Sequence, residues 1–442
     1  MRIGFIAMSG VRACDPELLK LGLTLPGFVE RGKTIASLPS LGLLTLAGMT
    51  PDYHELEYLD VADIRSLATL PDRFDLVVIS SFSAQIFEAY ELADRLRERG
   101  TRVVLGGLHV TSLPDEAALH ADSIVVGEGE SVWPELMSDL DTDTLKPRYV
   151  SSGDFSFLNA PFPRFDLLDI EKYNRLTVQT SRGCPLQCEF CAGSILLTRR
   201  YKTKPIDKVL AEIDGIRTLW QNPFIEFADD NSFVNREYWK ELLPQLQHRG
   251  LSWFTECDLR VYEDPELLEF MRAAGCVEVL IGFESPVEQG LSGLELKSDW
   301  KYRRWHEYRE AIHRIQSHGI RVNGCFILGL DEHTPSIFDE VYEFARESEL
   351  YDVQITIQTP FPGTPLYHRL KAAGRLLHDG QWNRCTLFDI NYLPERMSVE
   401  ELRSGFYNLA LKLYSDESSR WRRTNFNRKF LKPLIRKGRT LS

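Results

Sequence analysis

Two runs of alternating strand and helix patterns, separated by a linker, most strongly limit what this chain can fold into. Apolar segments such as residues 74–81 and 176–180 are each followed by a segment with helical spacing and then by another apolar segment. Strands that are buried on both faces and joined by helices form parallel sheets. Residues 151–174 lie between the runs and are rich in Pro, Gly and Ser, which is typical of an interdomain linker. The pattern predicts an α/β protein with two parallel sheets.

The two runs predict different kinds of sheet. Residues 1–150 follow the pattern of a doubly wound, Rossmann-like domain. Residues 175–370 contain six strand–helix units, fewer than the eight that close a full barrel, so we expect a partial (βα)6 barrel. Residues 371–442 show helical spacing and end in a basic tail, which indicates a small helical C-terminal cap.

Three cysteines lie close together at the start of the second run. Cys184, Cys188 and Cys191 have the spacing CxxxCxxC, which brings three thiolates within reach of one small inorganic cluster. Electron-transfer iron–sulfur clusters usually take four cysteines, and no fourth is nearby, so one iron would keep an open position. A zinc knuckle is the alternative, but zinc loops generally show a second C-x2-C pair, which this chain lacks.

Polar and small residues follow the strands of the predicted barrel, where barrel enzymes build their active sites. A single acid at such a place is as often a helix N-cap as a ligand. Together, and in register with the cysteine loop, these residues predict a cofactor pocket. The candidates are Asp229, Asp230, Glu256, Glu284, Ser285, Gly324, Ile327, Gly329 and Thr359.

Small residues also gather at the strand ends of the first sheet, where open α/β sheets bind their ligands. Glycines there allow the backbone to approach a large flat ligand closely. No GxGxxG follows the first strand, which disfavours a dinucleotide. The candidate binding residues are Ser80, Ser81, Gly106, Gly107, Gly127 and Glu128.

The cysteine loop resembles the signature of the radical S-adenosylmethionine (SAM) enzymes, whose fold is an open six-strand barrel. An LGL helix at residues 41–43, a GGxH turn at 106–109 and a GEGE turn at 127–130 resemble the cobalamin-binding domain that precedes many of these enzymes. The chain thus resembles the family of radical SAM enzymes with a cobalamin-binding domain. The D-x-H-x-x-G motif is absent after Met8, so we expect no histidine ligand to cobalt, and His109 is interpreted as structural or pocket-lining.

The resemblance implies a set of cofactors and a reaction. Cys184, Cys188 and Cys191 would hold a [4Fe–4S] cluster beside Phe190, and its open iron would chelate SAM. Asp229 and Asp230 stand where the family holds the SAM amino group. The other barrel candidates stand where it contacts the ribose, carboxylate and adenine. Electrons from a donor such as flavodoxin or ferredoxin would cleave SAM to a 5′-deoxyadenosyl radical.

Methylation of an unactivated carbon or phosphorus in a small-molecule or lipid-like substrate, with cobalamin carrying the methyl group, is the reaction that the resemblance favours. A rearrangement, cyclisation or ring contraction without methyl transfer remains open. A non-catalytic cobalamin or redox sensor is the alternative from another class.

Charge is unevenly distributed along the chain. Nine Lys and Arg residues and no acid occur from Arg420 onward, so the rest is more acidic than the net charge of −12 indicates, which disfavours a nucleic-acid partner. The basic tail either contacts an anionic membrane or a lipid-like substrate, or docks on the acidic body as a helix, and we favour docking. No apolar run of about 18 residues predicts a membrane span. The scattered cysteines indicate a reducing compartment, so we expect a cytoplasmic protein.

Overall fold

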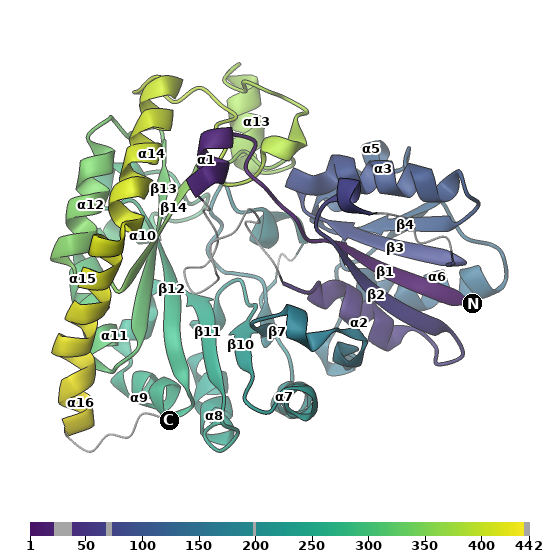
Figure 1. Cartoon of the computed structure of the whole chain (residues 1–442), viewed down its shortest axis with the longest axis horizontal. Coiled ribbons are helices and arrows are strands. Elements are labelled where there is room, and N and C mark those ends of the chain that lie inside the picture. Colours follow the sequence, from purple (N-terminus) through teal and green to yellow (C-terminus); the bar gives the residue numbers. More distant parts are fainter. Residues whose placement is uncertain (22–37, 68–72, 198–199, 437–442) are drawn as a thin grey trace.

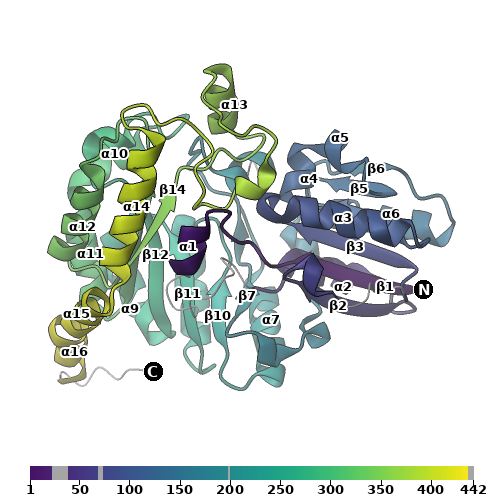
Figure 2. The same cartoon turned by 45° about the horizontal axis from the view of Figure 1, so that its top comes forward.

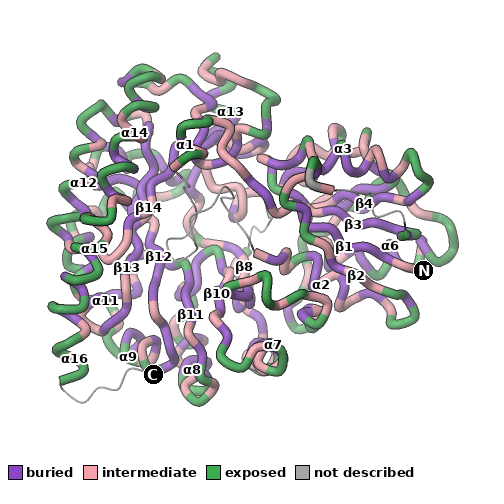
Figure 3. The backbone as a smooth tube through the Cα atoms, in the orientation of Figure 1, coloured by how far each residue is buried: buried purple, intermediate pink, exposed green. Residues whose placement is uncertain are grey.

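Two α/β bodies lie side by side, with helices packed on the faces of each parallel sheet (Figure 1). The computed structural model describes residues 1–21, 38–67, 73–197 and 200–436. The strands of both bodies are buried and most of the exposed backbone belongs to the outer helices (Figure 3). This arrangement confirms the predicted α/β fold with two parallel sheets.

The first sheet has six parallel strands in the order β2-β1-β3-β4-β5-β6. The order reverses between β1 and β3, which is the switch point of a doubly wound sheet. Apolar residues cover both faces of a strand such as β3, so helices pack on each side. The strands are β1 Arg2–Met8, β2 Glu55–Val61, β3 Leu76–Ser81, β4 Arg102–Gly106, β5 Ser123–Val126 and β6 Arg148–Val150. The helices are α2 Leu41–Met49, α3 Ile86–Arg97, α4 Leu108–Ser112, α5 Pro114–Ala117 and α6 Trp133–Asp141.

The second sheet also has six parallel strands, in the order β14-β13-β12-β11-β10-β7, so it forms the expected partial barrel. Two helices connect β12 to β13, because residues 305–307 form a 3-10 turn between them. The strands are β7 Leu176–Val178, β10 Phe224–Phe227, β11 Ser252–Cys257, β12 Cys276–Glu284, β13 Arg321–Leu328 and β14 Asp352–Ile357. The helices are α7 Ile206–Leu219, α8 Arg236–Leu246, α9 Pro265–Ala273, α10 Trp300–Arg304, α11 Tyr308–Ser317 and α12 Ile337–Glu347.

Side chains of each barrel strand alternate between an outer face, packed beneath the helices, and an inner face. In β12, Val279, Ile281 and Phe283 are at most 1% exposed and belong to the core beneath the helices. Side chains alternate along a strand, so Gly282 and Glu284 face the inside of the barrel. The same alternation places the acids of β10 and β11 inside the barrel.

The cap consists of helices packed over the edge of the barrel. Its helices are α13 Pro365–Ala372, α14 Val399–Tyr414, α15 Asp416–Phe426 and α16 Lys432–Arg436. Arg422 of the basic tail is buried and donates to the carbonyl oxygen of Leu413 at 2.8 Å, while Phe426 and Phe430 are buried beside it. The expected docking of the tail is therefore confirmed. In the described part of the chain, no helix is both long enough and apolar enough to cross a bilayer.

The segment that follows β1 leaves the first body and crosses to the cap, where it forms α1 Pro16–Leu21 (Figure 2). The carboxylate of Asp389 accepts hydrogen bonds from the backbone N–H groups of Cys14 and Asp15, both at 2.8 Å. Arg403 of α14 donates to the carboxylate of Asp15 at 2.7 Å. Residues near the N-terminus thus join the first body to the C-terminal cap.

Candidate active site

Cys184, Cys188 and Cys191 lie in the loop that leads away from β8 Ser181–Arg182. Burial raises the pKa of Cys184 and takes that of Cys188 to about 12, and a charge on Cys191 would raise both further, so the three thiols face one another. Only a bound cation would keep such buried groups as thiolates. Within the described ranges, no three His, Cys, Asp or Glu side chains are arranged to hold a single metal ion.

Neighbouring elements fix this loop from several sides. The backbone N–H of Gly183 donates to the carboxylate of Asp230 at 2.7 Å. The carboxylate of Glu189 accepts from two nitrogens of Arg369 in α13, at 2.9 and 2.6 Å. Phe190 is half-buried and packs against the main core. The barrel and the cap therefore both position the cysteines.

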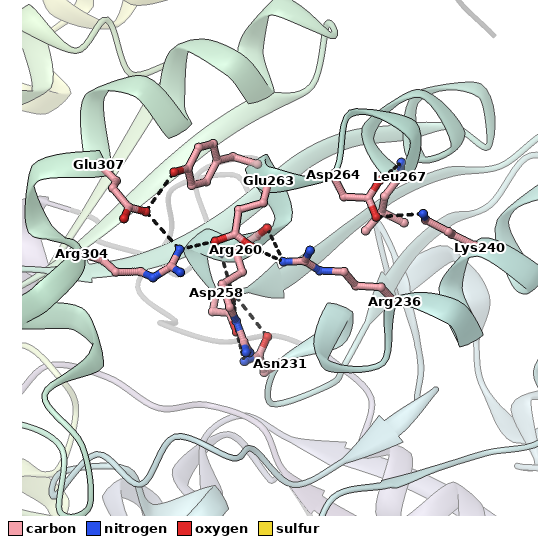
Figure 4. Close-up of polar contacts among 11 residues, drawn as sticks. Asn231, Arg236, Lys240, Asp258, Arg260, Glu263, Asp264, Leu267, Arg304 and Glu307 are labelled. Carbon is pink, nitrogen blue, oxygen red and sulfur yellow. Dashed lines mark hydrogen bonds and ion pairs between the residues drawn. The ribbon is translucent and has the colours of Figure 1, made fainter.

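Asn231 supports the loop through a network that the sequence did not reveal. Its side-chain amide donates to the sulfur of Cys184 at 3.7 Å and to the carboxylate of Asp258 at 2.9 Å. Asp258 in turn pairs with Arg260, and the adjacent acid Glu263 accepts from Arg236 (Figure 4). The side-chain amide of Asn231 thus supports Cys184, although an Asn after a strand is often only a helix cap.

The two acids after β10 have different surroundings. Asp229 is 3% exposed and accepts from the N–H groups of Thr180 and Ser181, at 2.7 and 2.9 Å, and from the hydroxyls of Thr180 and Ser232. One oxygen of Asp229 thus holds the backbone that leads into the cysteine loop and the other accepts from two hydroxyls, so a contact of Asp229 with SAM stays a prediction. Asp230 is exposed, and it remains the candidate for the SAM amino group.

Glu284 forms a buried ion pair with Lys301, a residue of α10. Burial alone would lower the pKa of Lys301, but Glu284 and the nearby Cys188 raise it, so the ammonium stays charged. Glu284 also has a φ of 61°, in the left-handed region that non-glycine residues rarely adopt. Such strain persists where surrounding contacts enforce it, often at functional sites.

Glu256 projects from β11 into the barrel. Burial, and then the charges of Glu226, Asp230 and Glu284, raise its pKa to about 7. Many protein atoms surround the Glu256 carboxylate, but the side chain still has solvent-exposed surface. The carboxylate has no hydrogen-bond or ion-pair partner among the described residues. An exposed, unpaired carboxylate on the inner face of the barrel is free to bind a ligand. Cys325 of β13 faces the same acids and is half-buried.

The remaining barrel candidates lie at the edge of this interior. The hydroxyl of Ser285 forms hydrogen bonds with the backbone of Val287 and with the imidazole ring of His333. The hydroxyl of Thr359 donates to the carbonyl oxygen of Ile357. A side chain at Gly324 would meet Leu350 and Phe283, and one at Gly329 would meet Tyr392 of the cap, so packing gives a separate reason for each glycine. Ile327 lies on the inner face. The adenine contacts of this group remain predictions.

A cleft of about 490 Å³ opens at the strand ends of the first sheet. Its deep part is apolar, with Val78, Val104 and Val125 on the sheet opposite Leu46 and Trp133, as a flat aromatic group requires. Its outer part is lined by Ser80, Gly106, Gly107, Gly127 and Glu128, as the sequence predicted, together with Gln179, Arg182, Gly193, Ala228 and Asp230 from the barrel. One Glu128 oxygen is buried without a hydrogen-bond partner in the described residues. These features fit a large amide-bearing corrin.

His109 does not line this cleft. Its side chain is fully buried, and its ring nitrogens lie 3.0 Å from the hydroxyl of Ser83 and 3.2 Å from the carboxylate of Glu116. Among the described residues that line the cleft there is no histidine. The structure therefore places His109 as a structural residue, as interpreted from the sequence.

The GEGE turn connects the two bodies. Arg182, two residues before the first cluster cysteine, donates to Glu128 at 2.8 Å, to Glu130 at 2.7 Å and to Gln179 at 2.9 Å. Both acids are buried, with side chains 2% and 9% exposed. Lys202 adds a second cation to Glu128. The cleft and the cysteine loop are therefore held together by charge-assisted hydrogen bonds.

Comparison with known families agrees with this geometry. The family model of the B12 binding domain matches residues 33–137, and that of the radical SAM superfamily matches residues 178–345. A domain of unknown function, DUF4070, matches residues 364–439. The bacteriochlorophyllide d C-12(1)-methyltransferase of Chlorobaculum tepidum is 30% identical over 391 residues, which are 85% of this chain and 82% of that protein. The chain belongs to the radical SAM family with a B12-binding domain.

Other relatives of the enzyme catalyse different reactions. The hopanoid C-2 methylase of Rhodopseudomonas palustris is 29% identical over 78% of the chain and 66% of that protein. The anaerobic magnesium-protoporphyrin IX monomethyl ester cyclase of Cereibacter sphaeroides is 27% identical over 88% of the chain and 69% of that protein.

A solved structure shares the fold. The radical SAM methyltransferase TsrM from Kitasatospora setae, solved with cobalamin and a [4Fe–4S] cluster, matches with a TM-score of 0.69 at 15% identity, over 94% of this chain and 89% of that one. The enzyme therefore uses a [4Fe–4S] cluster, SAM and cobalamin as cofactors. Methyltransferases are thus among its relatives.

Proposed function

We propose that the enzyme methylates an unactivated carbon of an apolar, ring-containing small molecule. The tetrapyrrole and hopanoid named for its relatives share this character. Phosphorus acceptors are retained as a second possibility within the same reaction class.

One observation carries this proposal: residues of both bodies line a single cleft. Gln179, Ala228 and Asp230 face the barrel interior and also line the cleft of the first sheet. When bound, the cluster and SAM supply a 5′-deoxyadenosyl radical and cobalamin supplies the methyl group. Arg182 and Asn231 hold the cysteine loop against this cleft. A substrate in the barrel mouth would then contact both reactive groups without leaving the protein.

Ring formation without methyl transfer is the second candidate, since the cyclase of Cereibacter sphaeroides is also related. A non-catalytic sensor is not proposed, because the relatives are enzymes. We propose that a flavodoxin or ferredoxin reduces the cluster in a cytoplasmic, reducing environment, in which the five cysteines outside the cluster loop stay free thiols as they are in the structure.

The test follows label from SAM. Anaerobically reconstituted enzyme, a chemical reductant and SAM carrying a labelled methyl group would be incubated with an apolar extract of the source cells. We expect a labelled product and 5′-deoxyadenosine together. Unlabelled product with 5′-deoxyadenosine would favour ring formation, and neither product from a reduced, SAM-bound cluster would refute both candidates. The combined change of Cys184, Cys188 and Cys191 to alanine should abolish both signals.

A steric variant separates the two cofactors. A side chain at Gly42, in the first turn of α2, would meet no atom within 4 Å, and Gly42 lines the cleft. Gly42→Trp should therefore block cobalamin uptake while SAM cleavage continues, whereas Gly42→Ala, the matched control, should bind both. Gly127 is unsuitable, because a side chain there would lie 2.9 Å from Ser151 at a φ of 86° and strain the turn itself.

A further inference from the structure

The docked C-terminal helices leave a strongly cationic outer surface, which we call the basic face. The cations of this face form no ion pair with any described residue. They are Arg272, Arg321, Arg346, Arg420, Arg423, Arg428, Lys432 and Arg436. Elsewhere on this acidic protein most Lys and Arg side chains pair with a carboxylate, so the basic face stands out electrostatically.

Contacts between these elements show that the basic face is continuous. The guanidinium of Arg346 in α12 lies 5.7 Å from the ring centre of Trp421 in α15. Arg321 lies 4.8 Å from the ring centre of Tyr351, beside Arg423. Arg272 and Leu434 of α16 both border the same turn, at Gly319. Three barrel arginines thus extend the charge of the tail.

Nearby acids, such as Asp416 and Glu417 in the first turn of α15, cancel only part of this charge. Asp352 is paired with the buried Arg422, Glu349 with Lys429 and Glu347 with Arg309. Burial raises the pKa of Glu278 to about 8, so its carboxyl is mostly neutral at physiological pH. The basic face therefore keeps a net positive potential.

Apolar side chains stand among the cations. Trp421 is 39% exposed and Ile435 is 50% exposed. An outward stripe that combines Lys and Arg with Trp and Ile is typical of helices that lie on a membrane surface. A nucleic-acid duplex would use the charges but leave these apolar groups without a partner, because its bases are already stacked.

The position of the basic face argues against an electron donor as its partner. Arg321 and Asp352 are the first residues of β13 and β14, so the face lies at the amino ends of the barrel strands. The cysteine loop lies at the opposite, carboxyl ends, and Figure 1 shows α15 and α16 along the outside of the barrel. A donor bound there would be separated from the cluster by the whole barrel.

We propose that the basic face attaches the enzyme to an anionic membrane surface, with Trp421 and Ile435 inserted at the headgroup level. This inference is independent of the proposed reaction. The attached enzyme would keep its mouth and cysteine loop directed away from the lipid and open to a water-soluble electron donor.

Vesicle sedimentation of the reconstituted enzyme tests the proposal. We expect binding to phosphatidylcholine vesicles in which about a third of the lipid is phosphatidylglycerol, and none to pure phosphatidylcholine. Changing Arg420, Arg423, Arg428 and Lys432 together to glutamine should weaken binding on the order of a hundredfold, since each cation near an anionic surface contributes. The matched control changes Arg95, Arg99, Lys146 and Arg148 of the first body to glutamine and should bind normally.

Further measurements distinguish an anionic lipid surface from free phosphate and from nucleic acid as the partner. Raising the salt should release the enzyme, and inorganic phosphate should release no more than chloride of equal ionic strength. Ile435→Ser should weaken binding several-fold without a change of charge. Equal sedimentation of the quadruple variant and the control would overturn the proposal, as would tighter binding to a duplex oligonucleotide than to vesicles. SAM cleavage by the quadruple variant should stay normal, which separates this inference from the proposed reaction.

Discussion

Loss of the Arg182 side chain should weaken cobalamin binding by leaving a buried charge without a partner. Arg182 is 18% exposed, and Glu130, its acceptor in the first body, is 9% exposed. Removal of one partner from a buried pair costs about 3–5 kcal/mol. Glu128 would keep Lys202, but in Arg182→Gln Glu130 would have no ion-pair partner and only the more distant charge of Lys202.

This loss of free energy destabilises the arrangement in which the cleft of the first body contacts the barrel. A cofactor that contacts both bodies binds this arrangement, so its apparent affinity falls as the arrangement becomes less populated. Because 1.4 kcal/mol corresponds to a tenfold change, we expect hydroxocobalamin affinity to fall at least tenfold, measured by absorption titration without oxygen. The exposed pair of Arg164 with Asp166 supplies the control, because Arg164→Gln should change the affinity little.

The pH dependence distinguishes this charge effect from general damage. Burial raises the pKa of Glu130, but Arg182 outweighs it, so the folded value is lower than usual. The wild-type pair therefore contributes fully above the usual Glu pKa of about 4.3 and is lost only as pH falls through the lowered value. In Arg182→Gln the same carboxylate has a raised pKa, so acidification should improve binding.

A second variant completes this test. Arg182→Gln combined with Glu130→Gln removes both charges and should bind cobalamin better than the single variant. If the single and double variants bind equally and acid restores nothing, the ion pair does not hold the two bodies together, and our explanation of the GEGE turn fails.

Three further outcomes follow from the site. Because Glu256 ionises near pH 7, affinity for the cationic SAM should rise from pH 6 to 8 in the wild type, and an equal rise in Glu256→Gln would contradict this. Asp229→Asn should lower the iron content after reconstitution, whereas Asp230→Asn should mainly weaken SAM binding. The opposite pair of results would show that the roles of the two acids are exchanged. His109→Gln should leave the absorption spectrum of bound cobalamin unchanged, and a shifted cobalt band would show ligation.

Periodicity and local motifs were sufficient to predict the framework. Both parallel sheets, the six barrel strands and the cysteine loop follow from apolar runs and cysteine spacing, which are short-range properties of the chain. The cleft residues at Gly106, Gly107 and Gly127 were also predicted, since the carboxyl ends of parallel strands meet at one edge.

The sequence could not reveal partnerships between distant residues. Glu128 and Glu130 were noted as a turn motif, but their pairing with Arg182 joins residues 54 and 52 positions apart. Asp229 was assigned to SAM because strand-end acids often bind ligands, and only the fold shows that it accepts from Thr180 and Ser181. Lys301 gave no sequence signal for its ion pair with Glu284.

The crossing of the N-terminal segment to the cap sets an order for biosynthesis. The first body can fold as soon as it leaves the ribosome, but Cys14 and Asp15 cannot dock until Asp389 and Arg403 have been made. Until then these hydrogen bonds do not join the N-terminal segment to the cap. We therefore expect large cofactors to enter the space between the bodies before the last helices close it. Asp389→Ala should therefore exchange bound cobalamin faster than the wild type, and equal exchange rates would show that the tie does not control entry.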